Sequence, residues 1–360
     1  MPFRDALGNV DPYRPQPPMG VLAARLGLPR MIKLASNEGA FGPLPASVGA
    51  YHAAAAGLHR YPDGGATPLR EALAARHGVP FDQVVIGNGA DELIRLCGAI
   101  ALDPGDSAVV PWPSFPSYLS AAAVHGAGVV RVPPSEGWAT DLDAVSGMRG
   151  RVVFLANPNN PTGTLLDRKR VRRFLGGLPP RVLCVLDEAY AEYADPAPEG
   201  PALVAEGREN LCVLRTFSKA YGLAALRVGY AIASPDVAAA LNRVRPIFNV
   251  NQPAQEAALA ALGEAAAVTE RVAHVHRARE RLRVALDAAG LGPVASQTNF
   301  VLAETPDGDA DGLADRLLRK GFIVRALRGF GAPRAIRVTC GTDEENAAFA
   351  AILPEVVSRT

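Results

Sequence analysis

Lys219 is the residue whose surroundings most clearly suggest covalent chemistry. The chain carries 37 basic residues, and only four of them are lysines. Lys219 lies in the string TFSKAYGLAALRVGY among apolar and hydroxyl residues, with Arg227 eight positions later. An arginine is always charged, whereas a desolvated lysine amine can form a Schiff base with a carbonyl compound. Lys219 is therefore a candidate nucleophile. We expect Lys169 and Lys320 to be solvated surface charges, and Lys33 has no comparable setting.

A glycine-rich string follows the first apolar run of the chain. GNGADELI begins at Gly87 and combines glycines with an acidic residue that opens a predicted helix. Such a helix start offers free backbone N–H groups to an anion such as phosphate, at the carboxyl end of a strand where open α/β sheets bind ligands. An ordinary turn before a helix explains this string equally well.

Two further strings place polar side chains after apolar runs. NPNNPTG could be a turn, but Asn160 within it is also a side-chain donor at a strand end. DEAY begins with Asp187 at the end of a buried run, where a carboxylate is costly unless a cation pairs with it. A protonated pyridine nitrogen is such a cation. For DEAY taken alone, an Asp that caps the next helix is the simpler interpretation.

Short apolar runs alternate with helical stretches and indicate an α/β fold with a mainly parallel, seven-stranded sheet covered on both faces. After Ser234 the pattern becomes helical, with a long Ala- and Arg-rich stretch from about Gln255 to Ala289. Strands return as NFVLAE, GFIVRA and AIRVTC, which predicts a smaller α+β domain. The seven expected core strands are Val84–Ile86, Ala108–Val110, Val129–Val132, Val152–Ala156, Val182–Leu186, Leu211–Leu214 and Val228–Ile232.

The predicted domain division has three parts. Residues 1–35 form an extended arm, 36–250 form a large domain, and 251–360 form a small C-terminal domain with a long linking helix. The proline-rich string DPYRPQPP favours an extended arm rather than a helix.

The composition limits the class of protein. With 49% hydrophobic residues, 20% charged residues and a net charge of +1, the chain has the balance of a globular protein and no feature that calls for nucleic acid. No apolar run approaches the roughly 20 residues that span a bilayer, and no signal peptide pattern is present. Four scattered cysteines predict reduced thiols, and the histidines lack metal-ligand spacing. We therefore expect a cytoplasmic protein without a membrane partner or a metal.

Together and in this order, the strings resemble the fold-type-I enzymes that use pyridoxal 5′-phosphate (PLP), specifically the histidinol-phosphate aminotransferase family. The resemblance covers nearly the whole chain. It implies PLP as the cofactor and a ping-pong amino transfer from histidinol phosphate to 2-oxoglutarate, within histidine biosynthesis. The strings that carry it are IKLASNE, YPDGG, GNGADELI, NPNNPTG, DEAY, TFSKAYGLAALRVGY, RPIFNVN, QTNFVLAE, GFIVRALRGFG and IRVTCGT.

The resemblance also implies roles for individual residues. Lys219 would form the Schiff base with PLP and move the proton during transfer, and Asp187 would pair with the pyridinium nitrogen. The other implied cofactor ligands are Asn160 and Tyr190 at the ring hydroxyl, Phe115 on the ring face, Thr216, Ser218, Arg227 and the backbone of Ala90 and Asp91 at the phosphate, and Tyr61 from the neighbouring subunit of a homodimer with shared active sites.

On the substrate side, the resemblance implies that Arg337 binds the α-carboxylate of glutamate or 2-oxoglutarate. Arg325 would meet the distal anion of either substrate. Without the resemblance, a solvated basic face would be the better interpretation of both arginines. Tyr13 and Asn37 would also contact the substrate. They lie in YRPQPP and SNEGAFGP, the two strings that depart from the family pattern, so the identity of the substrate stays open.

Three alternatives remain at this point. An aminotransferase for another amino acid, aromatic or from specialised metabolism, would use the same cofactor residues, and so would a PLP decarboxylase or lyase of the same fold. A catalytically inactive binding module would be indicated by loss of Lys219 or Asp187, and both are present.

Overall fold

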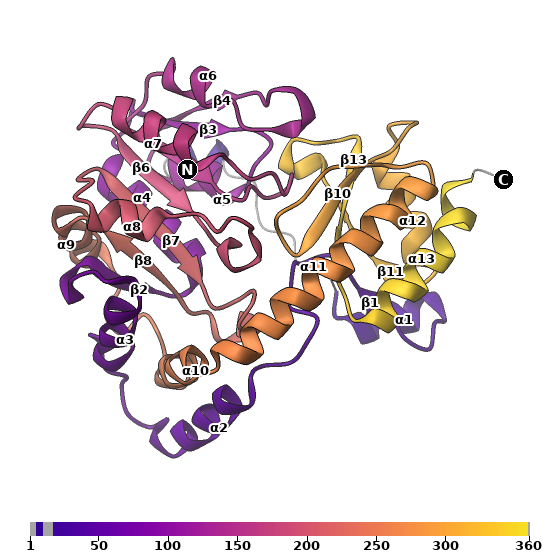
Figure 1. Cartoon of the computed structure of the whole chain (residues 1–360), viewed down its shortest axis with the longest axis horizontal. Coiled ribbons are helices and arrows are strands. Elements are labelled where there is room, and N and C mark those ends of the chain that lie inside the picture. The colour runs from indigo at the N-terminus through magenta and orange to yellow at the C-terminus, as the bar shows by residue number, and fades with distance from the viewer. Residues whose placement is uncertain (1–4, 10–16, 359–360) are drawn as a thin grey trace.

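The computed structural model describes residues 5–9 and 17–358, and its largest feature is a seven-stranded sheet (Figure 1). The strands lie in the order β2-β8-β7-β6-β5-β3-β4, and only β8 is antiparallel to its neighbours. The predicted fold class and all seven predicted strands are confirmed, with small differences at the strand ends. The bounds are β2 Val84–Gly87, β3 Ser107–Pro111, β4 Gly128–Val132, β5 Val152–Ala156, β6 Leu183–Asp187, β7 Leu211–Thr216 and β8 Gly229–Ala233.

Helices cover both faces of this sheet, which explains why its strands are apolar without alternation. In β5, Val153 and Leu155 belong to one core cluster, whereas Phe154 belongs to the cluster on the opposite face. Helices α3, α7, α8 and α10 contribute to the first cluster, and α4, α5 and α9 to the second. The helices of this region are α2 Pro45–Ala54, α3 Thr67–His77, α4 Gly89–Ala101, α5 Ser117–Ala123, α6 Leu142–Ser146, α7 Arg168–Gly177, α8 Gly200–Ala205 and α9 Pro235–Val244.

A smaller unit is built on an antiparallel sheet of order β12-β13-β10-β9. Its core includes Leu282, Leu317 and Phe349, which come from the three helices α11, α12 and α13. Helix α11 runs between this unit and the large sheet (Figure 1). The bounds are β9 Gly292–Pro293, β10 Phe300–Glu304, β12 Arg325–Ala326, β13 Ala335–Thr339, α12 Ala310–Arg319 and α13 Asp343–Val357.

Two details of the C-terminal region differ from the sequence prediction. The helical stretch expected from about Gln255 to Ala289 is two helices, α10 Gln252–Leu262 and α11 Ala265–Ala288. Gly263 follows α10, and Glu264 leaves the helical region at φ −99° and ψ 45°, so the axis is interrupted. The single strand expected in GFIVRA is also split, into β11 Phe322–Ile323 and β12 in a different sheet.

The N-terminal segment contains helix where an extended arm was expected. Helix α1 spans Met19–Leu26 and ends at Gly27, whose φ of 65° is the left-handed conformation that glycine tolerates. The prolines that suggested an extended arm precede this helix, and MGVLAARL consists largely of helix-forming residues. Further along, β1 Ile32–Lys33 pairs in parallel with β11, so this segment joins the C-terminal unit. The short 3-10 helices are η1 Asp5–Asn9, η2 Ala55–Gly57, η3 Phe81–Gln83, η4 Glu136–Trp138, η5 Ala191–Tyr193, η6 Ala224–Leu226 and η7 Arg328–Phe330.

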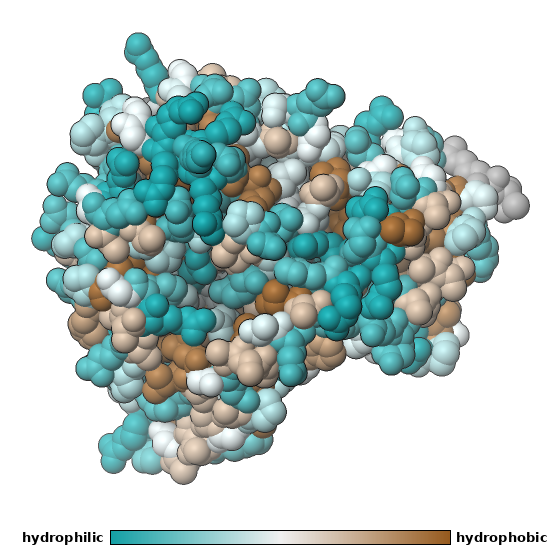
Figure 2. Space-filling view, in the orientation of Figure 1, coloured by the Kyte–Doolittle hydropathy of each residue, from teal (hydrophilic) through white to brown (hydrophobic). Residues whose placement is uncertain are grey.

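The surface is mixed in character. Hydrophilic side chains cover the outward face of α11, whereas apolar side chains gather around α2 and α3 (Figure 2). Exposed apolar residues near α2 include Val48 and Leu58. Within the described ranges, no helix combines the length and the hydrophobicity that a membrane crossing requires. All four cysteines are buried and unpaired, as predicted.

Candidate active site

The predicted site residues follow the carboxyl ends of neighbouring strands in the large sheet. GNGADELI follows β2, WPSFPSY follows β3, NPNNPTG follows β5, and Lys219 follows β7. These strands run in the same direction, so their carboxyl ends share one edge of the sheet, where such folds bind ligands. Strand β13 of the smaller sheet brings Arg337 to this edge, where its Nη1 donates to Asn160 Oδ1.

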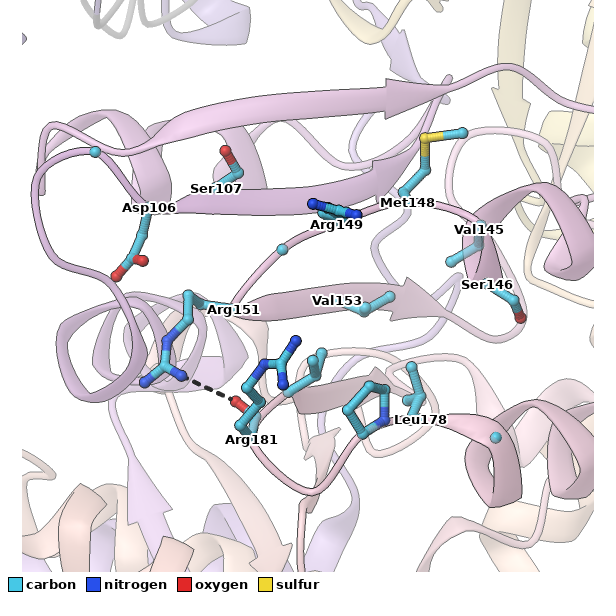
Figure 3. A pocket seen from close by; sticks show the side chains of 15 residues that line it. Asp106, Ser107, Val145, Ser146, Met148, Arg149, Arg151, Val153, Leu178 and Arg181 are labelled. Carbon is cyan, nitrogen blue, oxygen red and sulfur yellow. Dashed lines mark hydrogen bonds between the residues drawn. The ribbon is translucent and has the colours of Figure 1, made fainter.

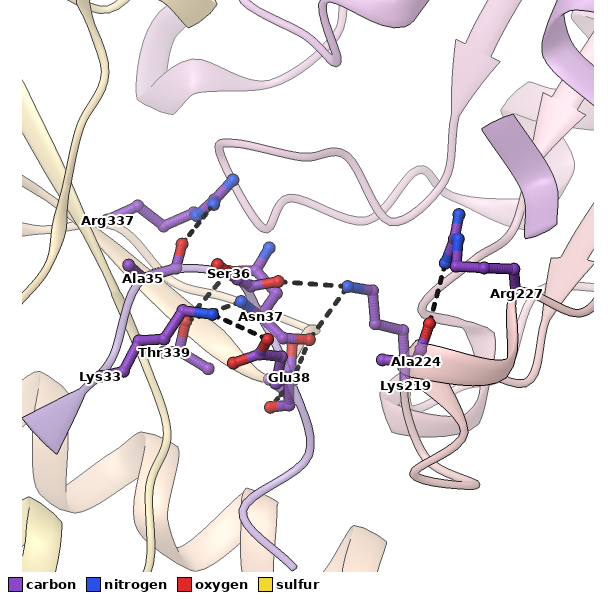
Figure 4. A network of polar contacts seen from close by, with 11 residues as sticks. Lys33, Ala35, Ser36, Asn37, Glu38, Lys219, Ala224, Arg227, Arg337 and Thr339 are labelled. Carbon is purple, nitrogen blue, oxygen red and sulfur yellow. Dashed lines mark hydrogen bonds and ion pairs between the residues drawn. The ribbon is translucent and has the colours of Figure 1, made fainter. Parts of the chain in front are cut away.

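Lys219 points from the large sheet toward the chain segment that includes Ser36 and Asn37 (Figure 4). Its Nζ donates to the carbonyl of Asn37 at 3.0 Å and to that of Ser36 at 3.4 Å. Burial, together with the positive charge of Arg337, lowers the pKa of the Lys219 amine to about 7. A substantial fraction of this amine is therefore neutral near pH 7, and the neutral form is the one that attacks a carbonyl.

Asp187 is the last residue of β6 and is buried. Its Oδ2 accepts a hydrogen bond from the Tyr118 hydroxyl at 2.7 Å, and its Oδ1 accepts from the backbone N–H of Ala189 at 3.0 Å. Burial raises the pKa of this carboxyl, while the two hydrogen bonds and the charge of Lys219 oppose that shift. An ionised carboxylate offers about four acceptor positions, so further positions remain for a cationic partner.

Asn37 connects the two sheets through its side chain. Its Nδ2 donates to the Tyr190 hydroxyl at 2.8 Å, and its Oδ1 accepts from Thr339 Oγ1 at 3.1 Å. Asn37 adopts a φ of 54°, a left-handed conformation that asparagine tolerates better than most residues. Burial raises the pKa of Tyr190 to about 12, so its hydroxyl stays protonated and can donate in turn. The side chain predicted to contact the substrate therefore already has protein partners.

A cup for an anion forms where α4 begins. Thr216 Oγ1 donates to Ser218 Oγ at 3.0 Å, and Arg227 Nη1 donates to the same hydroxyl at 3.4 Å. Gly89 starts α4 with a φ of 74°, and a Cβ at this position would lie 2.5 Å from Arg227 Nη2. The first N–H groups of a helix have no acceptor within it and point outward toward anions. The predicted phosphate ligands brought together here are Ala90, Asp91, Thr216, Ser218 and Arg227.

Arg325 and Arg337 lie directly opposite each other across β12 and β13. Arg337 is only 3% exposed, and its guanidinium lies over the rings of Phe300 and Phe330 at 5.2 and 5.0 Å. Burial and the charge of Arg325 lower the pKa of Arg337 to about 10. Each arginine has a buried Nε without a hydrogen-bond partner among the described residues. Two like charges with unsatisfied donors make this region suitable for an anionic group.

Two predicted ligands, Phe115 and Tyr61, are placed less centrally. Phe115 follows β3 and is partly buried, with its ring edge-on to Tyr118 at a centroid distance of 5.9 Å. Tyr61 is 82% exposed and stacks on Phe248 at the surface of this chain, with a centroid distance of 4.7 Å. Tyr13 lies outside the described residues.

The sequence interpretation did not single out three residues that the structure places in this network. Tyr118 contacts Asp187, Thr339 contacts Asn37, and Asn299 Nδ2 donates to the Asn37 carbonyl at 3.1 Å. Asn299 and Thr339 lie in QTNFVLAE and IRVTCGT, two of the strings that carry the resemblance, and Tyr118 lies three positions after Phe115 in WPSFPSY.

A cavity of about 550 Å³ lies elsewhere, at the amino ends of β3, β5 and β6 (Figure 3). Its lining includes Arg149, Arg151 and Arg181, and none of the predicted site residues. Because open α/β sheets bind ligands at the opposite edge, we place the candidate site around Lys219. In residues 5–9 and 17–358, no cluster of three or more His, Cys, Asp or Glu side chains is arranged to hold a metal ion.

Known proteins are similar to this chain in sequence and fold. Residues 29–353 match the family described as aminotransferase class I and II. The chain is 42% identical to a histidinol-phosphate aminotransferase of Anaeromyxobacter sp. (strain Fw109-5), with 98% of each chain covered. It is 41% identical to a protein of the same name from Moorella thermoacetica, covering 99% of this chain and 93% of that one. A crystal structure of histidinol-phosphate aminotransferase from Sinorhizobium meliloti in complex with pyridoxal-5′-phosphate superimposes with a TM-score of 0.90, at 31% identity and with 99% and 97% of the two chains covered.

Proposed function

Since this chain belongs to the class I and II aminotransferases and, within them, to the histidinol-phosphate aminotransferase family, we propose that it transfers the amino group of histidinol phosphate to 2-oxoglutarate. It is a PLP-dependent aminotransferase. We propose the amino donor, the oxo-acid acceptor and the roles of individual residues from the family and from the geometry of the described site residues.

The residues around Lys219 fit PLP. The cup at the start of α4 suits the phosphate, because Arg227 faces the space that a side chain at Gly89 would fill. Asp187 retains acceptor capacity for a protonated ring nitrogen. When bound, PLP supplies a carbonyl carbon that links to amines and a ring that takes up the electron pair released at the substrate α-carbon.

Lys219 would hold the cofactor and then carry the proton. Its lowered pKa keeps part of the amine neutral, so Nζ can take the proton that leaves the substrate α-carbon and later return it. Asp187 would keep the ring nitrogen protonated, because the ion pair favours both charged forms.

Asn160 and Tyr190 would hydrogen-bond the ring hydroxyl oxygen and fix the tilt of the ring. Both side chains are buried, and each already has a partner that orients it, Arg337 for Asn160 and Asn37 for Tyr190. Phe115 would cover the ring face from the end of β3. Asn160 and Tyr190 are held by protein partners of their own, and such fixed positions favour a defined geometry of reaction.

The proposed choice of substrate rests on the pair formed by Arg325 and Arg337. The two residues lie directly opposite each other across β12 and β13, and each keeps a buried Nε without a hydrogen-bond partner among the described residues. Arg337, beside Asn160, would bind the α-carboxylate of glutamate or 2-oxoglutarate, and Arg325 would meet the distal anion. That anion is a phosphate in histidinol phosphate and a carboxylate in glutamate, so one cationic site would serve both half-reactions.

We also propose a homodimer with shared active sites in the cytoplasm. Tyr61 is too exposed to serve its own site, and Leu58 and Ile247 nearby are 67% and 83% exposed. A second copy that covers this apolar surface would bring Tyr61 to the partner's phosphate cup. Four unpaired cysteines are compatible with a reducing compartment.

The two half-reactions test the proposed function separately. The purified PLP-loaded protein is mixed with glutamate, or with histidinol phosphate, without any oxo acid, and the absorbance of the bound cofactor is followed. Conversion by both amines supports the complete cycle, and the Lys219→Ala variant should show neither. If glutamate converts the cofactor and histidinol phosphate does not, the amino transfer stands and the proposed donor is wrong.

A further inference from the structure

Among the described residues, Tyr118 forms the shortest hydrogen bond to the carboxylate of Asp187, and it is not one of the predicted cofactor ligands. The Tyr118 hydroxyl donates to Asp187 Oδ2 at 2.7 Å, compared with 3.0 Å for the backbone bond from Ala189 to Oδ1. Each carboxylate oxygen therefore has one fixed donor. This arrangement sets the plane of the carboxylate and leaves the remaining lone pairs in defined directions.

The Tyr118 ring is itself held rigidly. It is 1% exposed and stacks on Phe154 with a centroid distance of 5.1 Å and an interplanar angle of 8°. Phe115 meets it edge-on at 5.9 Å. Because the Tyr118 ring is packed on two sides, its hydroxyl stays in one position. The hydrogen bond from Tyr118 therefore restrains rotation of the Asp187 carboxylate.

The charges around Asp187 make this hydrogen bond important. Burial favours the neutral carboxylic acid, and the negative charge of Asp91 adds to that tendency. The positive charge of Lys219 favours the ionised carboxylate. Its effect is only partial, because the Lys219 amine is partly neutral near pH 7. The Tyr118 proton stays on its oxygen, since burial and the charge of Asp187 raise the pKa of that hydroxyl well above its usual value. A permanent neutral donor thus stabilises the ionised carboxylate.

We propose that Tyr118 is a positioning residue that holds Asp187 ionised and oriented toward the protonated ring nitrogen of PLP. The proposal rests on the cofactor assignment above and is independent of which amine is the substrate. Tyr118 contacts neither the substrate nor the cofactor in this role, because it acts through Asp187.

The Tyr118→Phe variant removes the hydroxyl and keeps the ring. We expect the dissociation constant of PLP to rise about tenfold or more, the size expected for a hydrogen bond to a charged group. The midpoint of the pH-dependent absorbance change of the bound cofactor should move to higher pH. A ring that loses its positive charge withdraws less electron density from the nitrogen that links it to Lys219. Both quantities are measured without any substrate.

Two comparisons separate this role from simple packing. Tyr193→Phe also removes a hydroxyl from a tyrosine that is 1% exposed, and it should leave the PLP affinity and the absorbance midpoint unchanged. In the Asp187→Asn background, Tyr118→Phe should cost little further affinity, because the charge it stabilises is gone. Wild-type affinity and midpoint in Tyr118→Phe, or a full additional loss on top of Asp187→Asn, would overturn the proposal. Failure of histidinol phosphate as a donor would not affect it.

Discussion

The side-chain amide of Asn37 donates a hydrogen bond to the Tyr190 hydroxyl over 2.8 Å, and both side chains are buried. The same asparagine accepts from Thr339 of the smaller sheet and offers its carbonyl to Lys219. One residue therefore sets the surroundings of two groups that would touch the cofactor. Substitution of Asn37 should therefore change the properties of the bound cofactor before it changes the binding of the substrate.

Asn37→Asp tests this role because the two side chains have the same shape. The Asn37 amide donates a hydrogen bond to the Tyr190 hydroxyl oxygen, whereas a carboxylate at this position would accept one from that hydroxyl. The Tyr190 proton would then no longer be available to the ring hydroxyl oxygen of PLP. We expect kcat to fall about tenfold or more and the absorbance of the bound cofactor to shift. Asn346→Asp, the same change at a buried site in α13, is the control and should alter stability alone. An unchanged cofactor spectrum in Asn37→Asp would contradict this role.

The pH dependence of PLP addition follows from the lowered pKa of Lys219. Burial lowers that pKa from 10.5 to about 7, so the amine is already neutral above pH 7 in the folded protein. The rate of PLP addition to the cofactor-free protein should rise up to about pH 7 and level off above it, as followed by stopped-flow absorbance. The folded state binds the Lys219 proton less readily than the unfolded state. The contribution of this lysine to stability therefore falls as the pH drops from 10.5 to 7 and changes no further below. An addition rate that keeps rising to pH 10 would show that the amine is not desolvated.

Gly89→Ala tests the phosphate cup. The new Cβ would lie 2.5 Å from Arg227 Nη2 at a φ of 74°, so the guanidinium or the start of α4 must move. Strain of this kind costs about 1–3 kcal/mol, and we expect PLP affinity to fall by about tenfold or more. Gly176→Ala is the matched control, because its Cβ would meet nothing within 4 Å. Equal PLP affinity in all three proteins, measured by fluorescence titration, would argue against the cup.

Arg337→Gln should separate the two substrates. Loss of a buried cation that pairs with a carboxylate costs about 2–5 kcal/mol, so KM for glutamate and 2-oxoglutarate should rise at least about thirtyfold. Histidinol phosphate has no α-carboxylate, so its half-reaction should be affected less. Single-turnover absorbance of each half-reaction measures the difference, with Arg279→Gln in the same unit as the control. Equal losses for both amines would mean that Arg337 acts through Asn160 rather than on the carboxylate.

The shared-site dimer predicts complementation between two defective variants. Tyr61→Ala should lower PLP affinity by about tenfold and Lys219→Ala should abolish activity. A mixed dimer would contain one site with both Lys219 and a Tyr61 from the partner, so mixing and reassembly should restore activity. Tyr51→Ala, at another exposed tyrosine, should behave like the unmodified protein. A monomer in solution, or mixing without recovery, would refute the shared site.

The sequence predicted the large sheet and the residues at its carboxyl edge well. Strands such as β5 and β6 are buried at every position, so their apolar runs stand out from the surrounding loops. Asp187 ends β6, and Asn160 and Lys219 lie a few residues after β5 and β7, so the parallel strands bring these positions together whatever the intervening helices do. Tyr190 lies a few residues after β6, and Arg227 lies just before β8, whose amino end is at the same edge because β8 is antiparallel to β7.

The sequence was less informative where a contact joins distant segments. The role of Asn37 depends on Thr339, and Tyr118 on α5 reaches Asp187 at the end of β6 although α5 packs mainly on α4, β3 and β4. Neither relationship leaves a periodic pattern. Helix α1 was missed because the prolines before it dominated the local interpretation, and the break after Leu262 depends on a single Gly-Glu step. The positions of Tyr13 and the shared role of Tyr61 stay predictions.

The parallel pairing of β1 with β11 has a consequence for how the protein is made. During synthesis, Ile32 and Lys33 leave the ribosome long before their partners Phe322 and Ile323. The contact between Asn37 and Thr339 likewise joins residues 302 positions apart. Pairing over such separations is slow because a long loop must close first. The strands of the large sheet, which end at Ala233, can therefore pair before the segment that faces Lys219, because that segment must wait for β11 and Thr339 to emerge.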